Sequence, residues 1–160
     1  MDDVCLECGV PNVPGSCRAC FEALLAFEAE RPAVFGAVHH LTVATYYLQH
    51  PTGYGLEILA SWRSIAADAL NGRATQRDLQ QRMGRQFAGA RRVRDASARV
   101  PPDWPTRWPM TVADVLSPLA PLPSPELYVE RASAWAAATA AALDAAQGSS
   151  DVPARGRNGS

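Results

Sequence analysis

Four cysteines within the first twenty residues constrain the fold of this chain more than any other sequence feature. The spacing C-x2-C-x8-C-x2-C joins Cys5, Cys8, Cys17 and Cys20, and the remainder of the 160 residues contains no other cysteine. Two residues between a pair of cysteines allow both thiolates to point at a single ion, and two such pairs complete a tetrahedral Zn²⁺ site. The sequence therefore predicts that residues 1–20 form a zinc-binding head continuous with the rest of the fold.

The predicted zinc ion has a structural rather than a catalytic role, because a site closed by four protein ligands leaves no position for water or substrate. Free cysteines and a redox-active pair are the alternatives. A thioredoxin-like pair requires a βαβ setting, which the sequence does not indicate. The eight residues between the two cysteine pairs favour a compact zinc ribbon or knuckle pair that leads into a helix.

The remaining chain predicts a mainly α fold, because apolar residues recur at helical spacing over most of residues 21–147. We expect a bundle of four to five helices, at 18–30, 32–50, 54–71, from Thr75 onward, and 125–147. The second helix is apolar over most of its circumference, which predicts a central, buried position. Gly148 is expected to end the last helix, and the tail 148–160 to be disordered because it has nothing to bury.

A proline-rich segment separates the last two long helices. Residues 101–125 hold 8 of the 13 prolines, which argues against a long helix there. The segment also carries apolar side chains that need cover, including Trp104, Trp108, Leu119 and Leu122. We expect an extended strap packed along the helices, interrupted by one short helix near 112–117 with a capping box at its start.

A second group of polar residues is predicted where the first two helices meet. All three histidines, His39, His40 and His50, lie on the second predicted helix. His39 and His50 are about 16.5 Å apart along an α-helix, so they cannot bind the same ion. Glu28 continues the apolar face of the first helix, where a buried carboxylate requires a partner. An antiparallel hairpin of these helices would bring Glu28 close to His39.

Two interpretations of this polar group remain open. One is the active site of a metal- or histidine-dependent enzyme, with acid–base chemistry carried by Glu28, His39 or His40, and Tyr46 or Tyr47. The other is a buried polar network that fixes the register of the helices, with His50 satisfying backbone carbonyls at its helix end.

The segment Arg73–Arg99 is basic, with eight arginines and two aspartates. Such a surface can contact nucleic-acid phosphates, and Trp104 and Trp108 could stack on bases. A solvated surface is the more common outcome of such a pattern. The formal net charge of −1 also argues against a polyanion-binding surface over the whole protein.

The N-terminus is acidic and poor in apolar residues, unlike a secretory signal. The sequence has no uninterrupted apolar run of about 18 residues that could span a bilayer. We therefore expect a cytoplasmic protein without membrane contact, in which cysteines bind metal rather than form disulfides. The chain also lacks lysine, which excludes Schiff-base chemistry by a side-chain amine.

The motifs C-x2-C-G and C-x2-C-F, followed by VHHLTVATYYLQHP and WPMTVADVL, resemble a family of small bacterial proteins defined as a domain of unknown function. The resemblance covers most of residues 5–140 and implies a bacterial cytoplasmic protein, without bringing any functional residue. The function expected from the sequence is a zinc-stabilised interaction or regulatory module with a protein partner. The enzyme and nucleic-acid interpretations are the alternatives.

Overall fold

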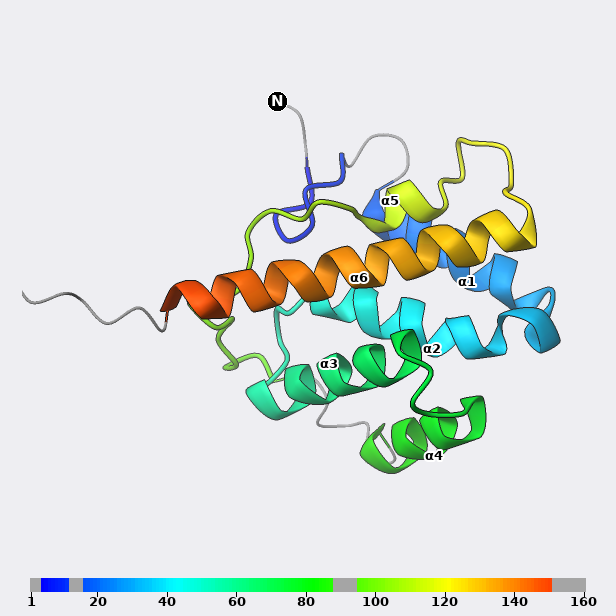
Figure 1. Cartoon of the computed structure of the whole chain (residues 1–160). Helices are drawn as coiled ribbons and strands as arrows, with labels where there is room; N and C mark the ends of the chain where they lie inside the picture. Colours follow the sequence, from blue (N-terminus) through cyan, green and yellow to red (C-terminus); the bar gives the residue numbers. More distant parts are fainter. Residues whose placement is uncertain (1–3, 12–15, 88–94, 151–160) are drawn as a thin grey trace, which may run out of the picture.

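The protein is mainly helical, as expected from the sequence (Figure 1). The computed structural model describes residues 4–11, 16–87 and 95–150. Its helices are α1 (Cys17–Ala29), α2 (Pro32–Leu48), α3 (Leu56–Leu70), α4 (Gln76–Phe87), α5 (Val112–Val115) and α6 (Pro125–Ser150). The described residues contain one isolated antiparallel bridge, between Val4 and Pro11, and no strand. The described part of the head is thus a tight turn rather than a β-ribbon.

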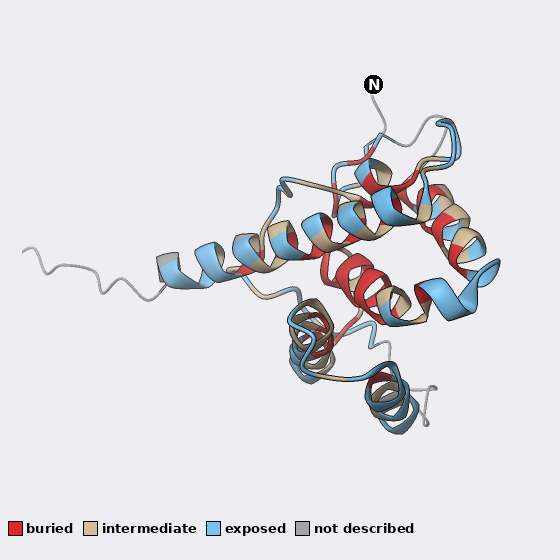
Figure 2. Cartoon of the chain, turned by 45° about the vertical axis from the view of Figure 1, so that its right-hand side comes forward, coloured by how far each residue is buried: buried red, intermediate tan, exposed pale blue. Residues whose placement is uncertain are grey.

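Helix α2 lies at the centre of the molecule, as expected for a helix that is apolar over most of its circumference. It packs against α1, α3, α4 and α6. Figure 2 shows buried residues around the C-terminal half of this helix, whereas α4 is mostly exposed at the edge of the fold. The two buried threonines of α2 are hydrogen-bonded inside the core: the Thr42 hydroxyl donates to Glu28 Oε1 at 2.8 Å, and the Thr45 hydroxyl donates to the Leu41 carbonyl at 2.7 Å.

Local sequence signals place the ends of several helices. The Ser16 hydroxyl accepts the Ala19 N–H at the start of α1, which satisfies one of the donors that a helix end leaves open. Thr111 and Asp114 form the expected capping box at the start of α5. Helix α6 differs from the prediction at its end, because it continues through Gly148 to Ser150. Residues 151–160, predicted to be disordered, lie outside the described residues.

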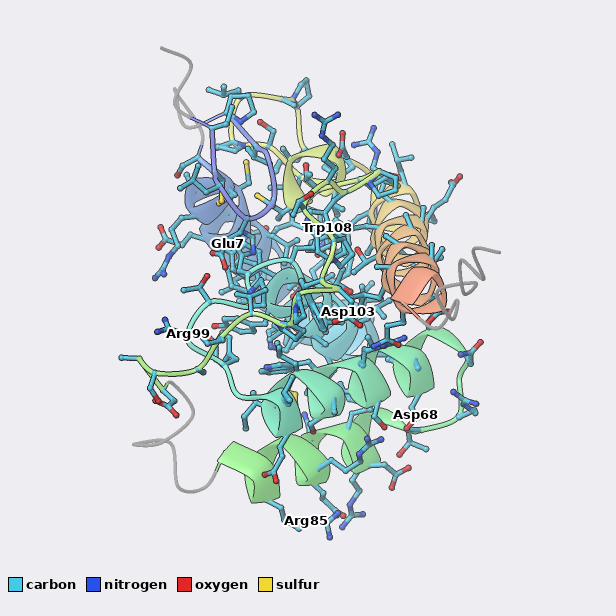
Figure 3. All side chains as sticks on the ribbon, turned by 90° about the vertical axis from the view of Figure 1, so that its left-hand side faces the viewer. Glu7, Asp68, Arg85, Arg99, Asp103 and Trp108 are labelled. Atoms are coloured by element: carbon cyan, nitrogen blue, oxygen red, sulfur yellow. The ribbon has the colours of Figure 1, made fainter. Side chains whose placement is uncertain are left out.

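The strap, residues 101–125, fastens the N-terminal turn and the end of α2 to each other. The Trp104 indole donates to the Leu48 carbonyl at 2.9 Å. The Trp108 indole donates to the Glu7 carbonyl at 2.9 Å, and Figure 3 labels both of these residues. The expectation that the whole strap is covered is wrong for Leu119 and Leu122, which are 68% and 65% exposed. Both lie in the connection between α5 and α6, outside either helix.

Candidate metal centre

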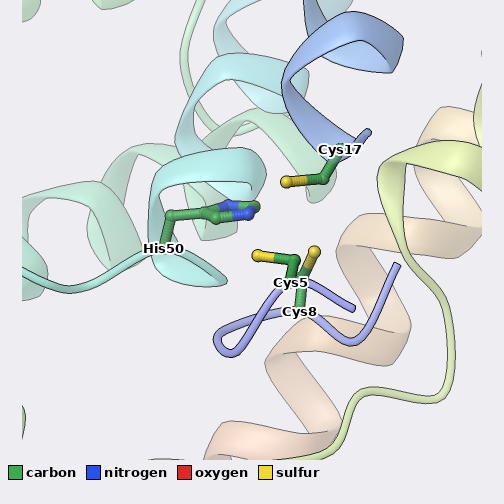
Figure 4. A group of neighbouring side chains, drawn as sticks. All are labelled: Cys5, Cys8, Cys17 and His50. Carbon is green, nitrogen blue, oxygen red and sulfur yellow. The ribbon is translucent and has the colours of Figure 1, made fainter. Parts of the chain in front are cut away.

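Three cysteines and one histidine converge beside the N-terminal turn. The ligand atoms of Cys5, Cys8, Cys17 and His50 all lie within 4.8 Å of one another. Figure 4 shows the three sulfur atoms and the imidazole ring gathered around a common centre. A tetrahedral ion with sulfur ligands at about 2.3 Å needs those atoms about 3.8 Å apart. The group is therefore close to the size that a metal ion requires.

The first two cysteines are positioned by a short turn. The Cys5 N–H donates to the Val10 carbonyl at 2.8 Å, and the Gly9 N–H donates to the Cys5 carbonyl at 2.8 Å. Gly9 has a φ of +80°, in the left-handed region that favours glycine. This turn directs Cys5 and Cys8 to the same side, which explains why glycine follows the first cysteine pair.

Cys17 is the first residue of α1, where backbone N–H groups and the helix dipole favour a thiolate. Its pKa is lowered, chiefly because Cys8 donates a hydrogen bond to its sulfur, with further contributions from the nearby His50 and Cys5. The same hydrogen bond, together with burial, raises the pKa of Cys8. The cysteine side chains are thus hydrogen-bonded to one another. A cation bound among them would displace their thiol protons.

His50 follows the end of α2 and completes the group. Its Nδ1 donates to the Tyr46 carbonyl at 2.7 Å, which confirms the expected contact with a helix-end carbonyl. This bond leaves the lone pair on Nε2, the nitrogen that faces the cysteines. Nε2 is buried and has no hydrogen-bond partner among the described residues. A buried nitrogen without a partner is costly, and a metal ion at this position would satisfy it.

The group differs from the predicted ligand set at its fourth position. Among the described residues it contains His50 and does not contain Cys20. Because α1 already begins at Cys17, Cys20 lies about 4.5 Å further along the helix axis. There it is buried in the hydrophobic core, and this burial raises its pKa.

The sequence makes Tyr46 a candidate for the site around Glu28 and His39. It lies instead beside Cys5, Cys8, Cys17 and His50, which together are called the metal group. Its ring stacks on Phe21 with 3.7 Å between centroids, and on the His50 ring with 4.1 Å between centroids. Burial and the neighbouring Cys17 raise the pKa of the Tyr46 hydroxyl. Tyr46 therefore holds the imidazole of His50 in place, whereas Tyr47 stacks on Trp62.

The predicted approach of Glu28 and His39 is present in the structure. His39 Nδ1 donates to Glu28 Oε2 at 2.7 Å. The hydroxyls of Thr42 and Tyr128 donate to Glu28 Oε1, at 2.8 Å and 2.5 Å. Glu28 is 3% exposed and belongs to a buried polar network, as one interpretation of the sequence expected. The His39 side chain is 42% exposed and borders a cavity, as the active-site interpretation requires.

His40 does not extend this pair into a metal site. Its Nδ1 lies 3.1 Å from the Met83 sulfur, and burial lowers its pKa, which favours the neutral ring. The described residues place no metal-sized group of ligand atoms at Glu28, His39 and His40.

The basic segment is partly neutralised where the structure describes it. Asp68 of α3 pairs with Arg82 at 2.6 Å and with Arg73 at 3.2 Å. Arg85 lies on the exposed side of α4 (Figure 3). Residues 88–94, which carry three more arginines, lie outside the described residues.

Over the described residues, every helix is too short or too polar to cross a bilayer. Comparison with known proteins found no matching curated protein and no matching solved structure. A family model described as a family of unknown function matches residues 3–144, which include the metal group and the Glu28–His39 pair. The resemblance of the sequence to such a family is thereby confirmed, and the chain belongs to this family, DUF5946.

Proposed function

We propose that the protein binds one Zn²⁺ ion through Cys5, Cys8, Cys17 and His50. The observation that carries this proposal is the buried Nε2 of His50, which has no partner among the described residues and faces three cysteines. Three thiolates and one imidazole are a common ligand set for structural zinc. Thiolates also favour zinc over the hard cations Mg²⁺ and Ca²⁺, which prefer oxygen ligands.

The ion would have a structural role, because four protein ligands leave no open position for a substrate. The ligands come from three separate parts of the chain: the N-terminal turn, the start of α1 and the residues after α2. The ion would therefore fix the turn to the helical body. The direct polar contacts of Glu7, with the Thr52 N–H and the Trp108 indole, support the same attachment.

The function that this arrangement supports best is a zinc-stabilised interaction module in the cytoplasm. The turn between the first two cysteines presents Leu6, which is 95% exposed, on a segment that the ion would hold rigid. A rigid apolar side chain at the tip of a turn suits the binding of an apolar pocket on a protein partner. Nucleic-acid binding has weaker support, because Arg73 and Arg82 are engaged with Asp68.

Metal content of matched variants tests the ligand set. We expect one zinc per chain in the wild-type protein and in Cys20→Ala, and a loss of bound zinc in His50→Gln. The Cys20→Ala variant is the matched control, since it removes a thiol from the same helix that carries Cys17. Zinc retained by His50→Gln but lost from Cys20→Ala would contradict the proposal and favour the four-cysteine set.

A further inference from the structure

A cavity of about 230 Å³ lies where α1, α2 and α4 meet, away from the metal group. Leu25, Pro32 and Phe35 form part of its apolar wall. Its polar lining comes from Glu28, His39, His40, Gln76 and Gln80. The cavity combines an apolar surface with a few converging polar groups, which is the usual composition of a small-molecule site.

The Glu28–His39 pair gives this cavity a proton acceptor. Glu28 accepts hydrogen bonds from three donors, and this is the pattern of an ionised carboxylate. Because His39 Nδ1 donates to Glu28, the lone pair of a neutral imidazole lies on Nε2. The His39 side chain is 42% exposed and lines the cavity, so this ring can be reached from the cavity. A carboxylate that orients a histidine in this way prepares it to act as a general base.

Gly36 and two glutamines also line the cavity. A Cβ atom at Gly36 would lie 2.1 Å from Gln76 Nε2, so the Gln76 amide occupies the space that this glycine leaves. Glycine in a helix interior is unfavourable compared with alanine, which indicates that the space at Gly36 serves a purpose. Gln76 and Gln80 are one turn apart on α4, and both line the cavity. Their amide N–H groups are suitable donors to a carbonyl oxygen.

We propose that this cavity is a hydrolytic site for small carboxylic esters, in which His39 acts as the general base for a water molecule. His39 Nε2 takes a proton from water while the water oxygen forms a bond to the ester carbonyl carbon. The negative charge that develops on the carbonyl oxygen is stabilised by amide N–H groups from Gln76 and Gln80. The tetrahedral intermediate then breaks its bond to the alkoxide, which takes the proton from His39, and an acid and an alcohol leave.

Water is the nucleophile in this proposal because the described residues that line the cavity include no serine, threonine or cysteine. The hydroxyls of Thr42 and Tyr128 donate hydrogen bonds to Glu28, so they orient the carboxylate and do not act as nucleophiles. The volume of about 230 Å³ suits a short acyl chain. The site shares no ligand residue with the metal group, so its activity is a separate property from zinc binding.

Hydrolysis of p-nitrophenyl acetate and p-nitrophenyl butyrate by the full chain tests the proposal. We expect His39→Gln to lower kcat/KM by about 100-fold, the usual contribution of a general base. Gln80→Ala is expected to lower kcat by about 100-fold, as the loss of an oxyanion donor does. Gln81→Ala is the matched control, since Gln81 is exposed on the same helix and does not line the cavity, and it should leave the rate unchanged.

A second variant separates the chemistry from the stability of the fold. Gly36→Ala adds a methyl group where the Gln76 amide lies, so it should lower kcat/KM while the helix keeps or gains stability. Zinc content is measured for each variant to show that the metal is retained. A rate in His39→Gln equal to that of the wild type, or no turnover of either ester above the buffer rate, would overturn the proposal. An acylated His39 in intact-mass spectra would also overturn it, because the imidazole would then be the nucleophile.

Discussion

Two histidines on one stretch of sequence take different roles because their Nδ1 atoms have different partners. His50 Nδ1 donates to a backbone carbonyl, and its Nε2 is buried among cysteines. His39 Nδ1 donates to the carboxylate of Glu28, and its ring is partly exposed beside a cavity. The first arrangement suits a neutral metal ligand, and the second suits a base. The residue type is the same, and the partner of one nitrogen decides the chemistry of the other.

Glu28 is the residue whose removal should most disturb the helical body. Glu28→Ala leaves His39, Thr42 and Tyr128 without their shared acceptor, so we expect a loss of about 3 kcal/mol in the free energy of unfolding. Urea denaturation measures this change. Glu22→Ala on the same helix is the control, because Glu22 and its partner Arg18 are both exposed, and such a surface pair contributes little to stability. Equal effects of the two substitutions would contradict the role given to Glu28.

The sequence alone could predict the Glu28–His39 contact but not the contact of His50 with the cysteines. Glu28 stands on an apolar helix face, and a short connection at Arg31 folds the next helix back towards it. Both signals are local. His50 meets Cys5 and Cys8 only because the end of α2 packs beside the N-terminal turn, a tertiary contact with no counterpart in the sequence pattern. The only local signal was its place at the end of a helix, which suggested a carbonyl contact.

At the scale of elements, a helix end can be predicted from the sequence where a capping side chain or a residue with positive φ stops the helix. Thr111 and Asp114 cap α5 as their spacing predicts. Gly72 lies two residues after the end of α3 and has a φ of +62°. Residues other than glycine adopt this conformation only with strain. Gly148 does not adopt such a φ, and α6 continues past it. A glycine therefore predicts a helix end only where the following chain needs the left-handed conformation.

The two glycines should respond to alanine in opposite directions. Gly72→Ala is expected to lower the free energy of unfolding by about 1–2 kcal/mol, because alanine is strained at positive φ. Gly148→Ala is expected to raise it by about 0.5 kcal/mol, since the added methyl meets open space within a helix. Thermal and urea denaturation of both variants measure these changes. A stabilised Gly72→Ala variant would be inconsistent with the conformation described for the end of α3.

At the scale of the whole molecule, the candidate metal ligands Cys5, Cys8, Cys17 and His50 come from segments that are far apart in the chain. The N-terminal turn contributes two ligands, α1 contributes one, and the fourth follows α2, the helix on which the bundle is built. The strap adds the Trp108–Glu7 hydrogen bond to the same turn. The long helices pack on one another independently of that turn, through α2 with α3 and α6. An ion bound by these four side chains would therefore stabilise the turn more than the bundle.

Removal of the metal should loosen the turn and leave the bundle folded. After treatment with a strong chelator under reducing conditions, we expect residues 4–11 to lose protection from hydrogen exchange. The centre of α2 and the first half of α6 should keep their protection, because they pack on each other in the buried core and contribute none of the four candidate ligands. Unchanged protection of residues 4–11 after complete metal removal would show that the turn does not depend on the ion.

X-ray absorption at the zinc edge of the reduced, full-length protein tests the central claim most directly, because it reads the ligand atoms themselves. The structure predicts three sulfur ligands at about 2.3 Å and one nitrogen ligand at about 2.0–2.1 Å, the distances typical of thiolate and imidazole. Those ligands correspond to Cys5, Cys8, Cys17 and His50. A spectrum that requires four sulfur ligands and no nitrogen would contradict the account and place Cys20 in the site instead of His50.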